Sequence, residues 1–100
     1  MTTKERIEKL LADNKVVLFM KGNPQAPQCG FSARATAILT ELETSFETVD
    51  VLQDQEIRQG IKEFGQWPTI PQLYINKELV GGSDIMMEMY ESGELKQALS

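Results

Sequence analysis

The feature that most constrains the fold is a run of five consecutive apolar residues, Val-Val-Leu-Phe-Met, at positions 16–20. A strand that is apolar at every position has no face for solvent, so both of its sides must be covered. Such strands lie inside the sheets of α/β proteins, where helices pack against the two faces. The run therefore predicts a central strand, and the neighbouring segments should supply the helices that cover it.

Helical periodicity is present along much of the remaining chain. The spacing of apolar residues predicts helices over residues 4–13, 30–43 and 54–64, a fourth helix capped by Ser83 or Asp84 and ended by Gly93, and a short helix over 94–99. We expect Gly65 to close the third helix. The inner faces of the second and fourth helices should carry Phe31, Ala35, Ile38, Leu39 and Leu42, and Ile85, Met86, Met89 and Tyr90, respectively.

Strand patterns complete the expected architecture. Residues 46–51 predict a second strand, and residues 72–75 and 78–80 predict a hairpin that turns at Asn76-Lys77. The segment that contains Pro24 and Pro27 is expected to be a loop. The order α-β-α-β-α-β-β-α places two parallel strands around a right-handed crossover helix, followed by the hairpin. We therefore expect residues 1–100 to form a single domain, an α/β sandwich.

Composition and charge exclude several classes of function. The chain carries 15 acidic and 10 basic side chains, a net charge of −5 at pH 7. This acidic balance argues against general nucleic-acid binding, which needs Lys and Arg to neutralise phosphates. The longest apolar run is far shorter than the roughly 18 residues of a membrane span, and the charged N-terminus does not resemble a secretory signal. We expect a cytoplasmic protein that binds neither nucleic acids nor membranes.

Cys29 is the only cysteine, and the chain contains no histidine. A single thiol cannot form an internal disulfide, and the lack of histidine excludes Cys-His catalysis and His-ligated zinc within one chain. Cys29 precedes the helix expected to begin at Gly30, where unpaired N–H groups, the helix dipole and the nearby Lys21 would favour a thiolate. The alternative is a buried structural cysteine, against which its position after a loop argues.

Four motifs give the sequence a family resemblance. They are Lys21 eight residues before the cysteine, Cys29-Gly30-Phe31-Ser32, Trp67-Pro68-Thr69-Ile70-Pro71, and Gly81-Gly82-Ser83-Asp84. Together they resemble the monothiol glutaredoxins of the CGFS type, over nearly the whole chain. The resemblance implies a thioredoxin-like (glutaredoxin) fold with a four-stranded mixed sheet flanked by helices, glutathione binding, and a 2Fe-2S cluster held between two protomers.

The chemistry of the residues can be compared with that implication. Ser32 stands where a C-x-x-C site has its second cysteine, so no thiol within the chain can resolve a mixed disulfide on Cys29. A 2Fe-2S cluster generally takes four ligands, usually thiolates, and each chain offers one. Two chains and two glutathione molecules would complete the set, which is the arrangement that the resemblance implies.

Glutathione has two carboxylates and one ammonium group, so its site needs cations at one end and anion-binding groups at the other. Lys21 and Arg58 are candidates for the glycine carboxylate, and Lys62 shares a helix face with Arg58. An ordinary solvated face is the alternative for both helical residues, although Arg58 matches the family's binding arginine. Ser83 and Asp84 open a helix whose free N–H groups suit the γ-glutamyl carboxylate, with simple N-capping as a competing role.

The backbone before Pro71 is the candidate contact for the middle of the tripeptide. Ile70 would offer its N–H and C=O as in strand addition, and the resemblance implies a cis Ile70-Pro71 bond that exposes them. Trp67 is either a wall of the site or part of the packing. The candidate glutathione contacts are Lys21, Gly30, Phe31, Arg58, Lys62, Thr69, Ile70, Pro71, Gly82, Ser83 and Asp84, and Cys29 is the candidate nucleophile and cluster ligand.

The leading hypothesis is a carrier of 2Fe-2S clusters, monomeric without the cluster and homodimeric with it, that delivers the cluster to iron-sulfur acceptor proteins. The segment over residues 22–28, longer than in dithiol relatives, favours this function, and the resemblance also suggests a BolA-like partner. The alternative is a glutathione-dependent oxidoreductase in which Cys29 attacks protein-glutathione mixed disulfides and a second glutathione resolves the intermediate. No sequence feature supports a third function, a redox-sensing thiol switch.

Overall fold

The computed structural model describes all residues 1–100 and contains every helix and strand that the sequence predicts. In chain order, the elements are α1 (Thr3–Asp13), β1 (Val16–Met20), β2 (Gly22–Asn23), β3 (Ala26–Pro27), α2 (Gly30–Glu41), β4 (Glu47–Asp50), the short 3₁₀ helix η1 (Val51–Gln53), α3 (Gln55–Gly65), β5 (Gln72–Ile75), β6 (Glu78–Gly81), α4 (Ser83–Ser92) and α5 (Glu94–Leu99).

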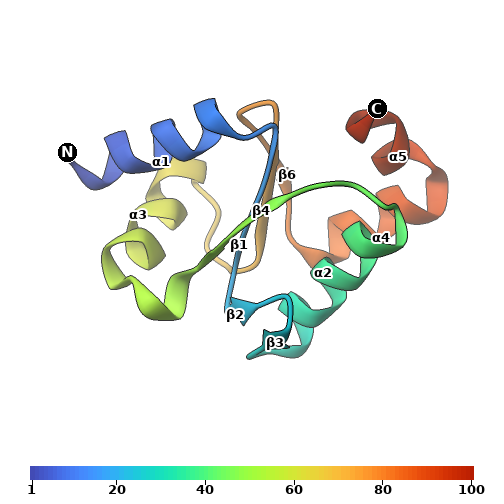
Figure 1. The fold of residues 1–100 in the computed structure, drawn as a ribbon, viewed down its shortest axis with the longest axis horizontal. Coiled ribbons are helices and arrows are strands. Elements are labelled where there is room, and N and C mark those ends of the chain that lie inside the picture. Colours follow the sequence, from blue (N-terminus) through green and yellow to red (C-terminus); the bar gives the residue numbers. More distant parts are fainter.

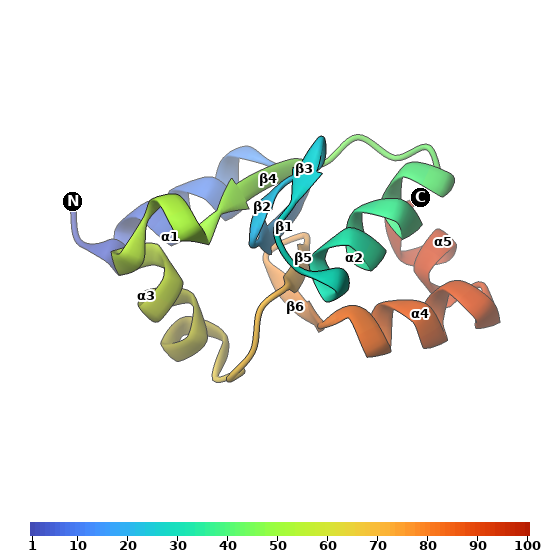
Figure 2. The same ribbon diagram turned by 90° about the horizontal axis from the view of Figure 1, so that it is seen from below.

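The central sheet has four strands in the order β4-β1-β5-β6. β1 is parallel to β4 and antiparallel to β5, and β5 pairs with β6 as the predicted hairpin. Helices α1 and α3 lie on one side of the sheet, and α2, α4 and α5 lie on the other (Figures 1 and 2). The predicted mixed sheet with helices on both faces is therefore confirmed.

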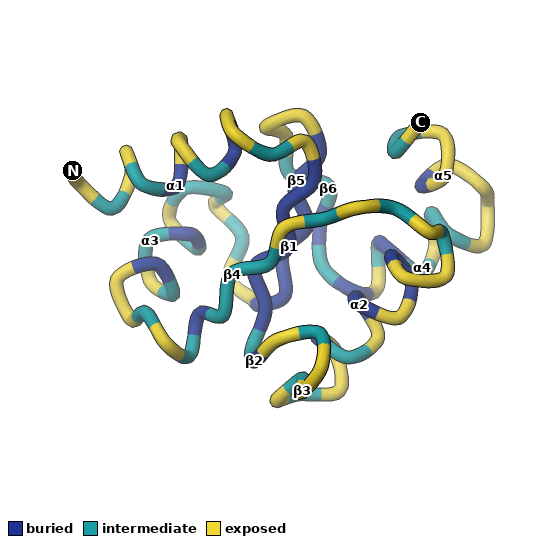
Figure 3. Tube along the Cα trace, in the orientation of Figure 1, coloured by how far each residue is buried: buried dark blue, intermediate teal, exposed yellow.

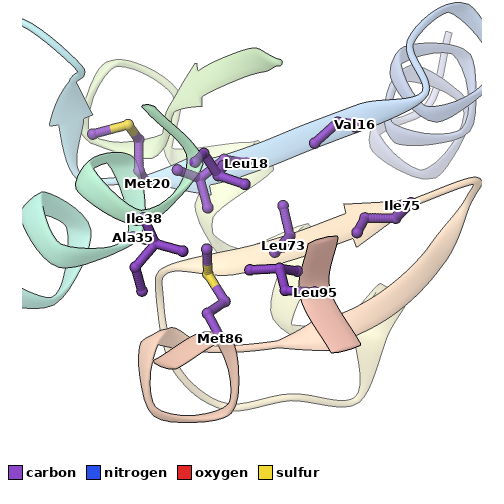
Figure 4. Packing of buried hydrophobic residues seen from close by; sticks show 10 residues of the cluster. Val16, Leu18, Met20, Ala35, Ile38, Leu73, Ile75, Met86 and Leu95 are labelled. Atoms are coloured by element: carbon purple, nitrogen blue, oxygen red, sulfur yellow. The ribbon is translucent and has the colours of Figure 1, made fainter. Parts of the chain in front are cut away.

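The strand β1 is covered on both faces, as the apolar run predicts. All five of its residues are buried, and β1 and β5 form the dark centre of Figure 3. Val17 and Phe19 pack with the residues of α1 and α3, whereas Val16, Leu18 and Met20 pack with those of α2, α4 and α5 (Figure 4). β1 therefore links two separate cores. Each fully buried side chain of this size contributes about 1.5–3 kcal/mol to the stability of the fold.

The segment expected to be a loop around Pro24 and Pro27 contains a small hairpin instead, formed by β2 and β3. The side-chain oxygen of Asn23 accepts hydrogen bonds from the N–H groups of Gln25 and Ala26, which closes the turn. Gly22 has a φ of +86°, and a Cβ on it would lie 2.5 Å from the carbonyl oxygen of Ala26. The tight turn therefore requires glycine at this position.

The end of α3 differs from the prediction that Gly65 closes the helix. Gly65 is the last helical residue, and Gln66 adopts the left-handed conformation with a φ of 50°. Glycine is needed at position 65 for another reason, since a Cβ there would clash with the hydroxyl of Tyr74 on β5. This residue permits the close approach of α3 to the sheet.

Two predictions about helix starts are wrong. The N-cap of α4 is Gly82, and no side chain caps this helix, so neither Ser83 nor Asp84 has the expected capping role. Phe31, placed on the inner face of the second helix, is 58% exposed. Phe31 lies in the first turn of α2, where its side chain lines the open cleft described below. The second strand is also shorter than predicted, because Val51 begins η1.

Gly65→Ala should lower the free energy of unfolding by about 1–3 kcal/mol, because the added methyl group forces the Tyr74 hydroxyl or α3 to move. Gly30→Ala is the matched control, since a Cβ on Gly30 has open space around it. Urea unfolding of both variants measures the difference. Equal stability of the two variants would contradict the close packing inferred at Gly65.

Candidate functional site

An open cleft of about 410 Å³ lies between the first turns of α2 and α4, the C-terminal part of α3 and the segment before β5. Its lining consists of Lys21, Phe31, Lys62, Trp67, Pro68, Thr69, Ile70, Pro71, Gly82, Ser83, Asp84 and Ile85. The cleft thus brings together residues from four separate motifs of the sequence. Three candidate residues, Cys29, Gly30 and Arg58, do not line it.

Cys29 lies beside the cleft, at the N-cap of α2. Its sulfur accepts a hydrogen bond from the backbone N–H of Ser32 at 3.3 Å, in the manner of a capping oxygen. The residue is partly exposed and forms no disulfide. The prediction of an accessible thiol at a helix start is therefore confirmed, and the alternative of a buried structural cysteine is wrong.

Ser32 is fully buried and connects the thiol to β1. Its Oγ accepts a hydrogen bond from the backbone N–H of Lys21 at 3.0 Å and lies 3.3 Å from the sulfur of Cys29. With Lys21 as its donor, the serine hydroxyl is free to direct its own proton toward an ionised sulfur. Ser32 replaces the resolving cysteine of a dithiol site with a hydrogen-bond donor.

The surroundings of Cys29 favour the thiolate. Partial burial of the sulfur opposes ionisation, but hydrogen bonds from the side chain and backbone of Ser32 and from the backbone of Phe31 oppose that effect. The positive charge of Lys21 adds to them, and the pKa of Cys29 is lowered from its ordinary value. A larger thiolate fraction near neutral pH makes the sulfur both a better nucleophile and a better metal ligand.

The segment before β5 offers an unpaired backbone edge to the cleft. The Ile70-Pro71 peptide bond is cis, as the family resemblance implies. Ile70 lies outside the helices and strands, and neither its N–H nor its C=O forms a hydrogen bond within the chain. An extended peptide in the cleft can pair with these two groups in the manner of strand addition.

Gln72, which the sequence analysis did not single out, supports this segment from the protein interior. Its side-chain amide donates to the carbonyl oxygens of Trp67 and Thr69, at 2.9 and 3.2 Å. Its Oε1 accepts from the hydroxyl of Tyr74, whose pKa burial raises to about 12. Gln72 is fully buried, so this network fixes the loop over residues 67–69 from inside the core. A polar residue at the start of an apolar strand was the available signal.

Groups that can bind an anion line the cleft from separate elements. Lys21 and Lys62 line one side, and the first turn of α4 lies on the other. Because α4 has no side-chain cap, its first N–H groups remain available to an anion. Arg58 lies one turn before Lys62 on α3, outside the lining. Trp67 is a wall of the cleft, and its buried indole N–H has no partner.

Asp84 has a partner that the sequence reasoning missed. Its carboxylate lies 3.8 Å from the guanidinium of Arg34 on α2, and its side chain is 87% exposed. The pair joins the helices on either side of the cleft opening, but at this exposure it contributes little to stability. Arg34 therefore adds a third cation near the cleft. It lies close to Asp84, the carboxylate that we expect to accept from the ammonium group of glutathione.

Comparison with known proteins agrees with this geometry. The glutaredoxin family matches residues 16–80. An uncharacterised monothiol glutaredoxin, ycf64-like, from Synechocystis is 60% identical over 97% of this chain and 91% of its own length. This chain belongs to the monothiol glutaredoxins. Ser32, in place of a second active-site cysteine, is the residue that makes this glutaredoxin monothiol.

Solved glutaredoxins share the fold. Reduced apo GrxS14 from poplar is 50% identical over 94% of this chain and 86% of its own, with a TM-score of 0.83. A glutaredoxin-glutathione complex from buckwheat has a TM-score of 0.86 at 23% identity, over 97% of this chain and 86% of its own. The fold is therefore the glutaredoxin, thioredoxin-like fold that the sequence motifs implied.

Ser32→Ala should raise the pKa of Cys29, because the thiolate loses a buried hydrogen-bond donor. The rate of alkylation by iodoacetamide should then fall about tenfold at pH 7 and approach the wild-type rate above both pKa values. Ser83→Ala is the control, since Ser83 is also buried but has no hydrogen bond to the sulfur. An unchanged pH profile in Ser32→Ala would show that the serine does not stabilise the thiolate.

Proposed function

We propose that this monothiol glutaredoxin binds glutathione in the cleft and uses it, together with Cys29, to carry a 2Fe-2S cluster between protein partners. The observation that carries the proposal is the pairing of one activated thiol with an adjacent cleft whose groups complement glutathione from end to end. The fold it shares with the buckwheat protein, whose structure contains glutathione, is consistent with this ligand.

The orientation of glutathione follows from the groups around the cleft. Lys21 and Lys62 suit the glycine carboxylate, with Arg58 as an outer contact one turn away. The free N–H and C=O of Ile70 suit the cysteinyl backbone, while Thr69 and Pro71 shape the same edge. At the other end, Gly82 and Ser83 suit the γ-glutamyl carboxylate and Asp84 its ammonium group. Gly30 and Phe31 lie on the Cys29 side, so the glutathione sulfur would lie near the protein thiol.

The donor set of one chain is too small for a cluster. No three potential ligands among Cys, Asp and Glu lie together in the structure, and Cys29 is the one thiolate. Two chains and two glutathione thiolates would supply the four ligands that a 2Fe-2S cluster requires. The cluster is then cargo at the junction of two protomers, and its loss would return the protein to a monomer. Acceptor iron-sulfur proteins would take the cluster, and a BolA-like protein is a candidate for one half of a mixed dimer.

An oxidoreductase activity is a second candidate, favoured by the lowered pKa of Cys29. The thiolate would attack the glutathione sulfur of a mixed disulfide and release the protein thiolate, which takes up a proton. A second glutathione thiolate would then attack the Cys29-glutathione disulfide, giving glutathione disulfide and free Cys29. Glutathione is the reductant, so electrons balance without a resolving thiol in the chain.

The proposed chemistry also restricts the compartment in which the protein can work. Thiolate ligation and free glutathione both require a reducing compartment, which is consistent with the expected cytoplasmic location. None of the helices combines the length and hydropathy of a membrane span.

Lys62→Ala should weaken glutathione binding about fivefold or more, because a charge-assisted hydrogen bond to the glycine carboxylate is lost. Lys77→Ala removes the same charge from the exposed β5-β6 turn, outside the cleft, and is the matched control. NMR titration of both variants with glutathione gives the affinities. Equal affinities would remove Lys62 from the site.

Anaerobic reconstitution with iron, sulfide and glutathione tests the carrier function. We expect a coloured dimer from the wild-type chain, and colourless monomers from Cys29→Ser or from wild type without glutathione. A colourless wild-type product would refute cluster carriage. Rapid turnover of a glutathionylated peptide by that same preparation, absent in Cys29→Ser, would then favour the oxidoreductase.

A further inference from the structure

A single carboxylate oxygen joins the segment that leads to Cys29 with the segment that leads to α3. Asp50 is the last residue of β4, and its Oδ1 accepts hydrogen bonds from the N–H of Gly22 and the N–H of Leu52, both at 2.9 Å. Gly22 begins the small β2-β3 hairpin that leads to Cys29, and Leu52 lies in η1, which leads to α3 and Lys62. No sequence motif marked Asp50.

The hairpin beyond Gly22 is internally fixed. The N–H of Gln28 donates to the carbonyl oxygen of Lys21 at 2.9 Å, which closes its base, and Asn23 closes its turn. The hairpin therefore moves as one piece, and its position relative to β4 depends on how it is attached. Among the hydrogen bonds of β2 and β3, the bond from Gly22 to Asp50 is the one that reaches β4.

The attachment at Asp50 continues to the sulfur through Lys21. The carbonyl of Lys21 accepts from Gln28, its N–H donates to Ser32, and its side chain lines the cleft. Ser32 in turn contacts the sulfur of Cys29. A shift of the Lys21-Gly22 backbone would therefore disturb the donor that stabilises the thiolate.

We propose that Asp50 is a positioning residue for the reactive thiol: by holding the N–H of Gly22, it keeps the β2-β3 hairpin and the Lys21 backbone in the arrangement that directs Ser32 at Cys29. This inference rests on Cys29 as the reacting group of the proposed function. Its test needs neither glutathione nor a cluster, so it can fail while that function stands.

The direction in which the pKa of Cys29 changes distinguishes a positioning role of Asp50 from an effect of its negative charge. Removal of an anion near a thiol would, by itself, favour the thiolate and lower the thiol pKa. Loss of the positioning hydrogen bond would raise it. The charged side chain that acts on the sulfur in this structure is Lys21, so neutralising Asp50 without losing its oxygen should leave the thiol almost unchanged.

The experiment compares Asp50→Ala with Asp50→Asn by the pH profile of alkylation of the intact chain with iodoacetamide. Asp50→Ala should react about three- to tenfold more slowly at pH 7, because the pKa of Cys29 rises. Asp50→Asn, which keeps an acceptor oxygen, should react at close to the wild-type rate. Hydrogen exchange at the amide of Gly22 should accelerate about tenfold or more in Asp50→Ala alone, since it loses its hydrogen bond.

Asp54→Ala controls for general destabilisation. Asp54 caps α3 through the N–H of Ile57 and pairs with Arg6, but it has no hydrogen bond to the hairpin. Asp54→Ala should lower the melting temperature without changing the alkylation rate of Cys29 or the hydrogen exchange of the Gly22 amide. If Asp50→Ala does not fold, Asp50→Ser takes its place, because its shorter side chain can still cap the local Leu52 N–H. A wild-type profile in the folded alanine or serine variant, or an equal change in Asp54→Ala, would overturn the proposal.

Discussion

The site depends on the N-cap of α2, where a sulfur takes the place usually held by an oxygen. Cys29 must remain partly exposed to react, yet the helix that it caps must be firmly held for the N–H of Ser32 to point at it. The core on the α2 side of β1 supplies that rigidity, since Ala35, Ile38 and Leu39 anchor α2 to the sheet. Ser32 adds a direct link from the first turn of α2 to the end of β1.

The cleft is built from segments whose backbone groups are left free. Ile70 lies just before β5 and keeps both of its backbone hydrogen-bonding groups unpaired, and α4 begins without a side-chain cap. Such groups are costly when buried, but in an open cleft they remain available to a ligand. Gln72 and Tyr74 hold the loop beneath them, so the binding edge is supported by a polar network inside the core.

Much of the fold was predictable because it depends on local patterns. The apolar run of β1 implied a covered sheet, and helical periodicity located every helix. The β2-β3 hairpin was missed because Asn23 closes its turn with a side-chain oxygen rather than through strand periodicity. The local pattern predicts Gly65 as a helix end, because its contact with Tyr74 is made across the fold and leaves no trace in the neighbouring residues. Helical spacing puts Phe31 on the inner face of its helix, because spacing alone does not show that this turn borders an open cleft.

The candidate site was predictable to the extent that its residues belong to motifs. Lys62 and the segment around Ile70 do line the cleft, whereas Arg58 lies outside its lining. Asp50 and Arg34 are invisible to local patterns, because each acts through a hydrogen bond or ion pair with a residue far away in the sequence. Gln72 binds carbonyl groups only a few residues away, and its one local signal is a polar side chain at the start of an apolar strand. The residues that support a site from behind are therefore the hardest to find from one sequence.

Native mass spectrometry of the reconstituted protein tests most directly whether the partners of the single thiol come from outside the chain. We expect an assembly of two chains, two glutathione molecules and one 2Fe-2S cluster. A cluster retained by one chain, or by two chains with no glutathione, would contradict it.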